Sequence, residues 1–94
     1  MIKDVVFKDK NFVLTSVNFQ NEKPMTEIIT KLGGKVRSSA VKDTDYVIYG
    51  DTETTKYKKA MELKSKGRNI TFIEEHDFVE YLNSLISKIN QKGE

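Results

Sequence analysis

Short runs of mostly apolar residues alternate along this chain with longer segments whose apolar residues recur at helical spacing. The runs occupy residues 12–15, 46–49 and 70–73, with a shorter one around Val36. A short apolar run without helical spacing is typical of a strand that is buried on both faces of a parallel sheet. The alternation therefore predicts a parallel sheet whose faces are both covered by helices.

Three segments carry the helical spacing. We expect the first helix to have Pro24 in its first turn and to end at Gly33 and Gly34, because proline is tolerated at a helix start and glycine at its end. We expect the second to begin at a capping hydroxyl, Thr54 or Thr55, and to end near Gly67. The third has Glu75 and Asp77 in its first turn, where acids are favourable. The side chains expected to face inward are Met25, Ile28, Ile29 and Leu32, then Tyr57, Ala60 and Met61, then Phe78, Leu82, Leu85, Ile86 and Ile89.

This order predicts an α/β fold, with a four-stranded, mostly parallel sheet and helices on both faces in three layers. A chain of 94 residues is long enough for one such core and too short for two. We therefore expect a single domain over residues 1–94, with residues 1–6 and 90–94 less ordered.

Composition excludes several classes of protein. No apolar run approaches the length of a membrane span and no signal sequence opens the chain, so a cytoplasmic location without membrane contact is expected. The absence of cysteine excludes disulfides and thiolate chemistry. The net charge of +2 is far from that of a general nucleic-acid coat protein, although basic residues crowd between Lys56 and Arg68.

The residues do not form a recognisable catalytic or metal site. The first strand ends in Thr15 and Ser16 without the acids of a receiver domain, and the glycines before Lys35 lack the spacing of a phosphate-binding loop. His76 lies among acids that open a helix and point in different directions. The acid pairs Asp43/Asp45 and Asp51/Glu53 fall in expected turns, where such residues form local hydrogen bonds. We therefore predict no enzyme activity, no cofactor and no metal.

Several fragments, in this order and spacing, resemble the BRCT domain, especially the form in bacterial NAD-dependent DNA ligases and clamp-loader large subunits. The resemblance covers nearly the whole chain. Phe78 stands where eukaryotic members have tryptophan, and we assign it to the core. The fragments are Phe7 with residues 11–15, residues 32–36, residues 42–48 with Gly50, residues 56–63, and residues 70–73 with Asp77 and Phe78.

The resemblance also implies a phosphate pocket where the first strand meets the second helix. Thr15 would supply a hydroxyl, Ser16 the next N–H, and Lys59 a positive charge. Ser16 departs from the glycine that is usual in the family. Arg37, Lys42 and Lys56 are further candidates for contact with DNA.

From this resemblance we expect a non-catalytic module of DNA replication or repair that recognises a phosphate, such as a 5′-phosphorylated DNA end. One alternative is a protein-interaction module that binds a phosphopeptide or uses an apolar surface. Another is that the chain is a fragment of a larger DNA ligase or exonuclease. Lysine far outnumbers arginine, which suggests a bacterial source. In a bacterium, a module of this kind is expected to associate with the nucleoid.

Overall fold

The computed structural model describes residues 5–38 and 43–92, and side chains only up to residue 87. Lys42 and the Ile89 side chain, both named above, therefore lie outside the described residues, as do residues 1–4 and 93–94. No helix among the residues described is both long and apolar enough to cross a bilayer. In chain order the elements are β1 (Asn11–Thr15), α1 (Phe19–Lys31), β2 (Lys35–Arg37), β3 (Tyr46–Tyr49), α2 (Thr55–Ser65), β4 (Thr71–Glu74) and α3 (Glu75–Lys92).

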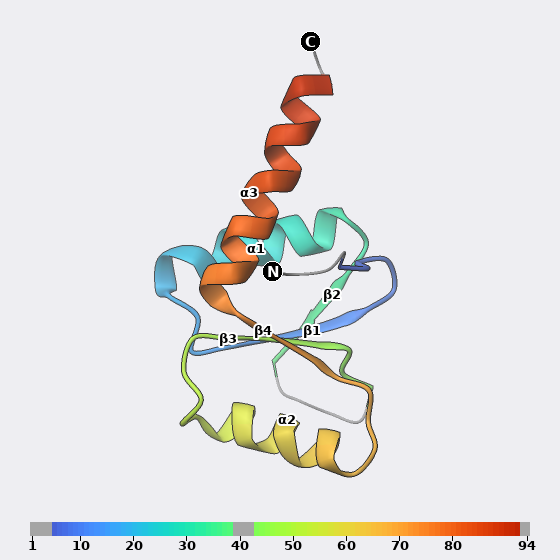
Figure 1. Cartoon of the computed structure of the whole chain (residues 1–94), viewed down its shortest axis with the longest axis vertical. Coiled ribbons are helices and arrows are strands. Elements are labelled where there is room, and N and C mark those ends of the chain that lie inside the picture. Colours follow the sequence, from blue (N-terminus) through green and yellow to red (C-terminus); the bar gives the residue numbers. More distant parts are fainter. Residues whose placement is uncertain (1–4, 39–42, 93–94) are drawn as a thin grey trace.

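The sheet has four strands in the order β2-β1-β3-β4. All three strand pairs are parallel, with Phe12 opposite Val36 and Tyr46, and Val47 opposite Phe72. All four strands therefore end at the same edge of the sheet. The expected parallel α/β sheet is confirmed, and its carboxyl edge lies on the left in Figure 1.

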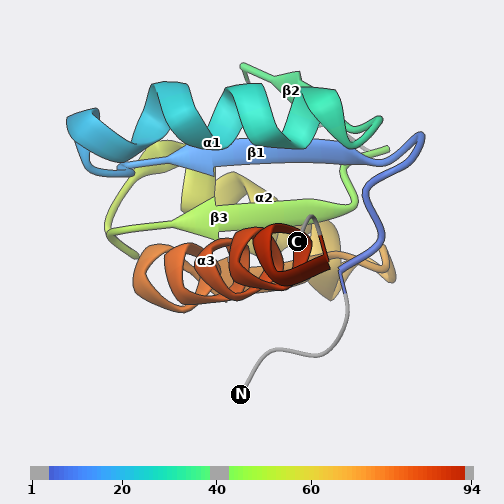
Figure 2. The same cartoon turned by 90° about the horizontal axis from the view of Figure 1, so that it is seen from above.

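Successive residues of β1 point to opposite faces of the sheet, so both faces need cover. Phe12 packs with residues of α1 and α3, whereas Val13 packs with Ala60 of α2. Figures 1 and 2 show the result as three layers, with α1 and α3 on one side of the sheet and α2 on the other. The expected helices on both faces are confirmed.

Residues next to each helix end determine where the helix begins or stops, and one predicted helix start has to be corrected. Thr54 caps α2, as expected, and Gly33 leaves α1 with a φ of +93°, a conformation that glycine adopts without steric cost. The expectation that Pro24 lies in the first turn of α1 was wrong, because the helix begins five residues earlier, at Phe19. Asn18 caps this earlier start, since its side chain accepts a hydrogen bond from the Gln20 N–H.

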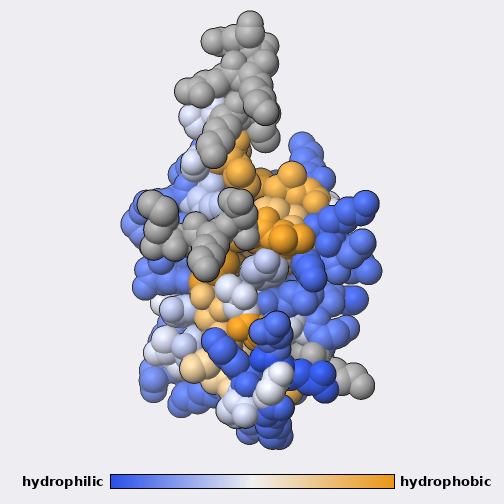
Figure 3. Space-filling model, turned by 45° about the vertical axis from the view of Figure 1, so that its right-hand side comes forward, coloured by the Kyte–Doolittle hydropathy of each residue, from blue (hydrophilic) through white to orange (hydrophobic). Residues whose placement is uncertain are grey.

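Three residues expected to face inward do not. Leu32 is 40% exposed, Met61 44% and Ile86 42%. In Figure 1 the carboxyl-terminal part of α3 projects beyond the sheet. Figure 3 shows apolar surface gathered near this projection, while most of the remaining surface in that view is hydrophilic.

Phe78 supports the packing of α3 on the sheet. It is fully buried, and its ring centroid lies 6.5 Å from those of both Phe7 and Phe12. Its replacement would leave a cavity between three elements that cannot easily collapse.

We expect Phe78→Ala to lower the free energy of unfolding by about 3–5 kcal/mol, measured by chemical denaturation. Ile86→Ala, on the exposed face of the same helix, should cost less than about 1 kcal/mol. Equal losses from the two variants would contradict this assignment of the core.

Candidate functional site

The first candidate residue, Thr15, ends β1 and joins it to the start of α2. Its Oγ1 lies 2.9 Å from Oγ1 of Thr54, and Thr54 Oγ1 in turn accepts the Tyr57 N–H at 3.2 Å. A hydroxyl has one proton to donate. When Thr54 donates to Thr15, the Thr15 proton becomes available to a third group. Thr15 is only 3% exposed, so its hydroxyl lies almost entirely beneath the surface.

Ser16 is exposed and has a φ of +54°, in the left-handed region that residues with a side chain seldom adopt. This is the position where the resemblance leads us to expect glycine. The conformation supplies the physical reason, because the chain turns sharply here from β1 toward α1. The sequence thus carries a strained residue at the centre of the candidate site.

The turn at Ser16 is held from two sides. The Gly50 N–H donates to the Thr15 carbonyl at 3.0 Å, and a Cβ on Gly50 would overlap the Ser16 carbonyl oxygen. The Glu75 carboxylate accepts the Asn18 N–H, with 2.9 Å to each oxygen, and the Asn21 side-chain amide at 2.7 Å. These contacts fix the backbone on both sides of Ser16.

The structure assigns positioning roles to Thr54, Gly50 and Glu75 that the sequence did not indicate. From the sequence, Thr54 and Glu75 were predicted only as features of their own helices, and Gly50 only as part of the family resemblance. Their positions in the sequence could have indicated this role. Each residue lies directly after a strand or directly before a helix, and such positions fall at the carboxyl edge of a parallel sheet.

The lysines of α2 differ in their position relative to Thr15. At about 1.5 Å per residue, Lys56 lies roughly 3 Å along the helix from the Thr54 position, whereas Lys59 lies roughly 7.5 Å along it. Both are exposed, and neither forms an ion pair with a residue that the structure describes. The structure therefore brings Thr15 and Thr54 together, with Lys56 nearer to them along the helix than Lys59.

Lys59 and Tyr57 lie on different sides of α2. Tyr57 packs against Tyr49 and Phe72, with ring centroids 4.9 and 5.3 Å away, and these rings belong to β3 and β4. Two residues along a helix correspond to a rotation of roughly 200°, so Lys59 lies on the opposite side from Tyr57. Lys59 is exposed, on the side of α2 that does not pack on the rings of β3 and β4.

Arg37 lies elsewhere. It ends the edge strand β2, opposite Val13, and its Nε donates to Asn11 Oδ1 at 3.2 Å. Since Asn11 begins β1, the guanidinium lies toward the amino end of the sheet, away from Thr15. The structure does not bring Arg37 to the candidate site.

Acidic groups occupy the other end of the carboxyl edge. Ligand atoms of Glu74, His76 and Asp77 lie within 4.8 Å of one another, but all three residues are exposed, and we assign no metal to them. The Nδ1 atom of His76 is also 3.2 Å from Oε2 of Glu80. Burial raises the pKa of Tyr49, and nearby Tyr57, Glu74 and Asp77 raise it further. These acids would repel an anion at the α3 end of the edge.

These features together define a small parallel α/β domain whose polar groups gather at one end of a central strand. Residues 3–76 match the family model described as the BRCA1 C Terminus (BRCT) domain. The chain belongs to the BRCT family.

Curated relatives are bacterial proteins named DNA ligase. The protein of Thermoanaerobacter pseudethanolicus is 43% identical over 79 residues, which cover 82% of this chain and 11% of the relative. That of Sulfurimonas denitrificans is 44% identical over 61 residues, covering 65% of this chain and 9% of the relative. The chain thus spans about a tenth of the length of these relatives.

Two solved structures of the Rad4 protein share the fold. The crystal structure of Rad4 BRCT1,2 with a Mdb1 phosphopeptide matches 93% of this chain and 44% of that chain, at 28% identity and a TM-score of 0.69. The corresponding structure with a Crb2 phosphopeptide has a TM-score of 0.70 at 28% identity and covers 87% of this chain and 44% of that one.

The backbone at Ser16 leads to a prediction about stability. The left-handed conformation costs a residue with a side chain about 1–2 kcal/mol, and glycine avoids this at an entropic cost of about 0.5–1 kcal/mol. We expect Ser16→Gly to raise the free energy of unfolding by about 0.5–1 kcal/mol, measured by urea denaturation.

Ser38 provides the matched control. It is also exposed and lies outside a helix or strand, but its φ is not positive. Ser38→Gly should therefore lower stability by about 0.5–1 kcal/mol. If both substitutions destabilise the protein, the conformation assigned to Ser16 is wrong.

Proposed function

We propose that this chain is a non-catalytic binding module of DNA replication or repair, and that it recognises a phosphate such as the 5′-phosphate of a DNA end. The observation that carries the proposal is the contact between Thr15 and Thr54, which joins the end of β1 to the first turn of α2. In the proposed site, this hydroxyl pair and the first turn of α2 would act together with lysines of the same helix. The naming of the bacterial relatives as DNA ligases supports a DNA ligand.

The proposed site uses groups suited to an oxyanion. The Thr15 hydroxyl and the Ser16 N–H would donate to phosphate oxygens, and Lys56 and Lys59 would approach from α2. Charge-assisted hydrogen bonds of this kind contribute about 1.5–3 kcal/mol each. The helix start adds a favourable partial charge. Three or four such contacts would hold a phosphate specifically but weakly, so affinity would depend on further contacts with the DNA.

A phosphopeptide is the second candidate, because both Rad4 structures contain one. Those structures comprise BRCT1 and BRCT2, and this chain matches 44% of the length of that chain. The groups that would recognise the peptide residues beside the phosphate would have to come from a second domain. The DNA hypothesis does not need a second repeat, and for this reason we place it first.

The relatives' length suggests how the module operates. We propose that it serves within, or beside, a larger ligase or related enzyme that supplies the chemistry, in the bacterial cytoplasm and near the nucleoid. The isolated chain is then expected to show no ligase, nuclease or phosphatase activity. A metal-dependent turnover that Asp43→Asn or Asp51→Asn abolishes would contradict this.

The phosphate site is tested by titrating blunt, recessed and single-stranded DNA, each with and without a 5′-phosphate. We expect Thr15→Val, Lys56→Ala and Lys59→Ala each to weaken binding of the phosphorylated end by about 1.5–3 kcal/mol and to leave unphosphorylated DNA almost unaffected. The double variant of Thr15 and Lys56 should lose less than the sum, because both residues would contact one phosphate.

Lys64→Ala is the charge-matched control. Lys64 lies on the same helix, but its Nζ is over the Phe72 ring, 5.2 Å from the centroid, on the side away from β1. An effect of Lys64 equal to those of Lys56 and Lys59 would reduce the site to a diffuse basic surface. Unequal effects of Lys56 and Lys59 would show which lysine contacts the phosphate.

Salt dependence separates the DNA from the protein hypothesis. Each phosphate that the protein neutralises in duplex DNA should add about 0.9 to the slope of log K against log salt. A few contacts therefore predict a modest but measurable slope. Association that does not respond to salt would instead indicate an apolar protein interface.

A further inference from the structure

Phe19 is the most exposed large apolar side chain among the described residues, at 90%, with Val6 next at 53%. A single exposed apolar residue is common and has no meaning by itself. The position of Phe19 is what sets it apart. It begins α1 at the carboxyl edge of the sheet, three residues after Ser16, whereas Val6 lies near the opposite ends of the strands.

The backbone of Phe19 is fixed without any help from its ring. Asn18 caps α1, and its own N–H is held by the Glu75 carboxylate at 2.9 Å. The ring is thus presented to solvent from an ordered helix start, and immobilising it costs only two side-chain torsions. Such a ring is prepared to act as a flat binding surface.

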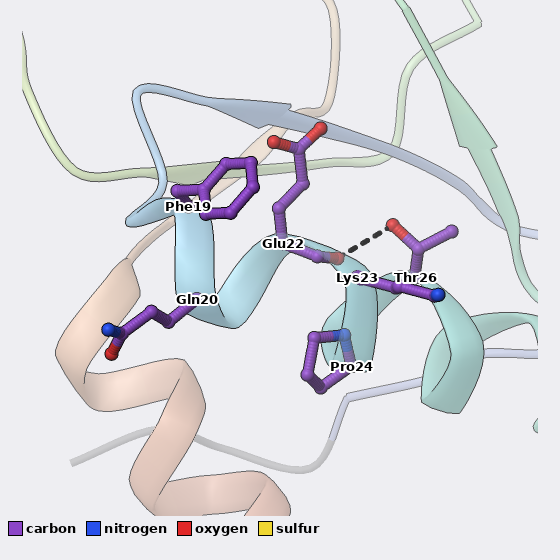
Figure 4. A pocket seen from close by; sticks show the side chains of 6 residues that line it. All are labelled: Phe19, Gln20, Glu22, Lys23, Pro24 and Thr26. Atoms are coloured by element: carbon purple, nitrogen blue, oxygen red, sulfur yellow. Dashed lines mark hydrogen bonds between the residues drawn. The ribbon is translucent and has the colours of Figure 1, made fainter.

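A shallow hollow of about 610 Å³ adjoins the ring and is open to solvent. This volume lies within the range of about 300–1,000 Å³ that is usual for small-molecule sites. In Figure 4, Phe19, Glu22 and Thr26 extend to one side of the helix, and Gln20 and Pro24 to the other. The residues around the hollow, hereafter the Phe19 hollow, are Phe19, Gln20, Glu22, Lys23, Pro24 and Thr26.

We propose that Phe19 stacks on the terminal base of a DNA end whose 5′-phosphate occupies the site at Thr15 and Ser16, an inference that rests on the proposed function. Three residues of chain span at most roughly 11 Å, so the start of α1 lies close to the turn at Ser16. The 5′-terminal nucleotide, which carries both the phosphate and the terminal base, can therefore contact both places. Every base has a π-face, so the contact would not depend on sequence.

The charges around the Phe19 hollow favour a base over a second phosphate. Glu22 and Lys23 both line it, so its formal charges cancel, and the Glu22 carboxylate would repel a backbone phosphate placed beside it. An uncharged aromatic ligand would not be repelled by this carboxylate. The proposed site therefore has a charged part at the end of β1 and a neutral, aromatic part at the start of α1.

The test compares a 5′-phosphorylated duplex with the same duplex carrying an abasic residue at the 5′ end. Phe19→Ala should weaken binding of the intact end by about 5- to 150-fold, the range for loss of one stacked base. The wild type should bind the abasic end as weakly as the variant binds the intact one, and Phe19→Ala should have no further effect there. Met61→Ala removes another exposed apolar side chain, 44% exposed and on α2, and should change nothing.

A spectroscopic readout is independent of affinity. The chain contains no tryptophan, so Phe19→Trp introduces a single reporter. Its fluorescence should be quenched by the intact phosphorylated end and not by the abasic end, with affinity retained. Denaturation midpoints within error of the wild type establish that each variant is folded.

The outcomes separate the two proposals. Phosphate-dependent binding with no effect of Phe19→Ala and no quenching overturns stacking and leaves the proposed function in place. Binding that ignores the 5′-phosphate in every variant overturns the proposed function, and stacking with it. If Phe19→Ala abolishes association with a protein partner while DNA binding is unchanged, Phe19 belongs to a protein interface and the stacking proposal is wrong.

Discussion

The two central strands, β1 and β3, are buried on both faces, and this constraint governs the rest of the molecule. Phe12 and Ile48 face one side of the sheet, and Val13 and Val47 face the other; all four are completely inaccessible to solvent. Because side chains alternate along a strand, neither face can be left to water. Helices must therefore cover both faces, and the right-handed parallel connections bring the start of each helix to the carboxyl edge.

That edge combines close packing with exposed polar groups. The turn after β1 fits against Gly50 so closely that a side chain there would overlap the Ser16 carbonyl, while Glu75 holds the start of α1. The same crowding forces Ser16 into its left-handed conformation. Strain of this kind persists only where the surrounding structure imposes it, and it often marks a site that binds a ligand.

The edge is also divided electrostatically, and this division bears on the proposed function. Lysines lie along α2, and Glu74 and Asp77 lie where β4 meets α3. A net charge of +2 hides this separation, because the opposite charges cancel in the sum. A small module can in this way direct an anion to one point of its surface without being strongly basic overall.

The sequence by itself determined the class of fold, because apolar runs and helical spacing are local properties that follow directly from burial on one or two faces. It also determined the helix ends at Thr54 and Gly33, whose chemistry acts within a few residues.

The sequence misplaced the start of α1, because proline is tolerated in a first turn but does not require one. The start is set by Asn18 and by Glu75, which is distant in the sequence. Leu32, Met61 and Ile86 were misjudged because spacing identifies a helical face but not where the neighbouring elements end. The link between Thr15 and Thr54 joins residues 39 positions apart, and only the tertiary structure could decide which hydroxyl of α2 would meet the end of β1.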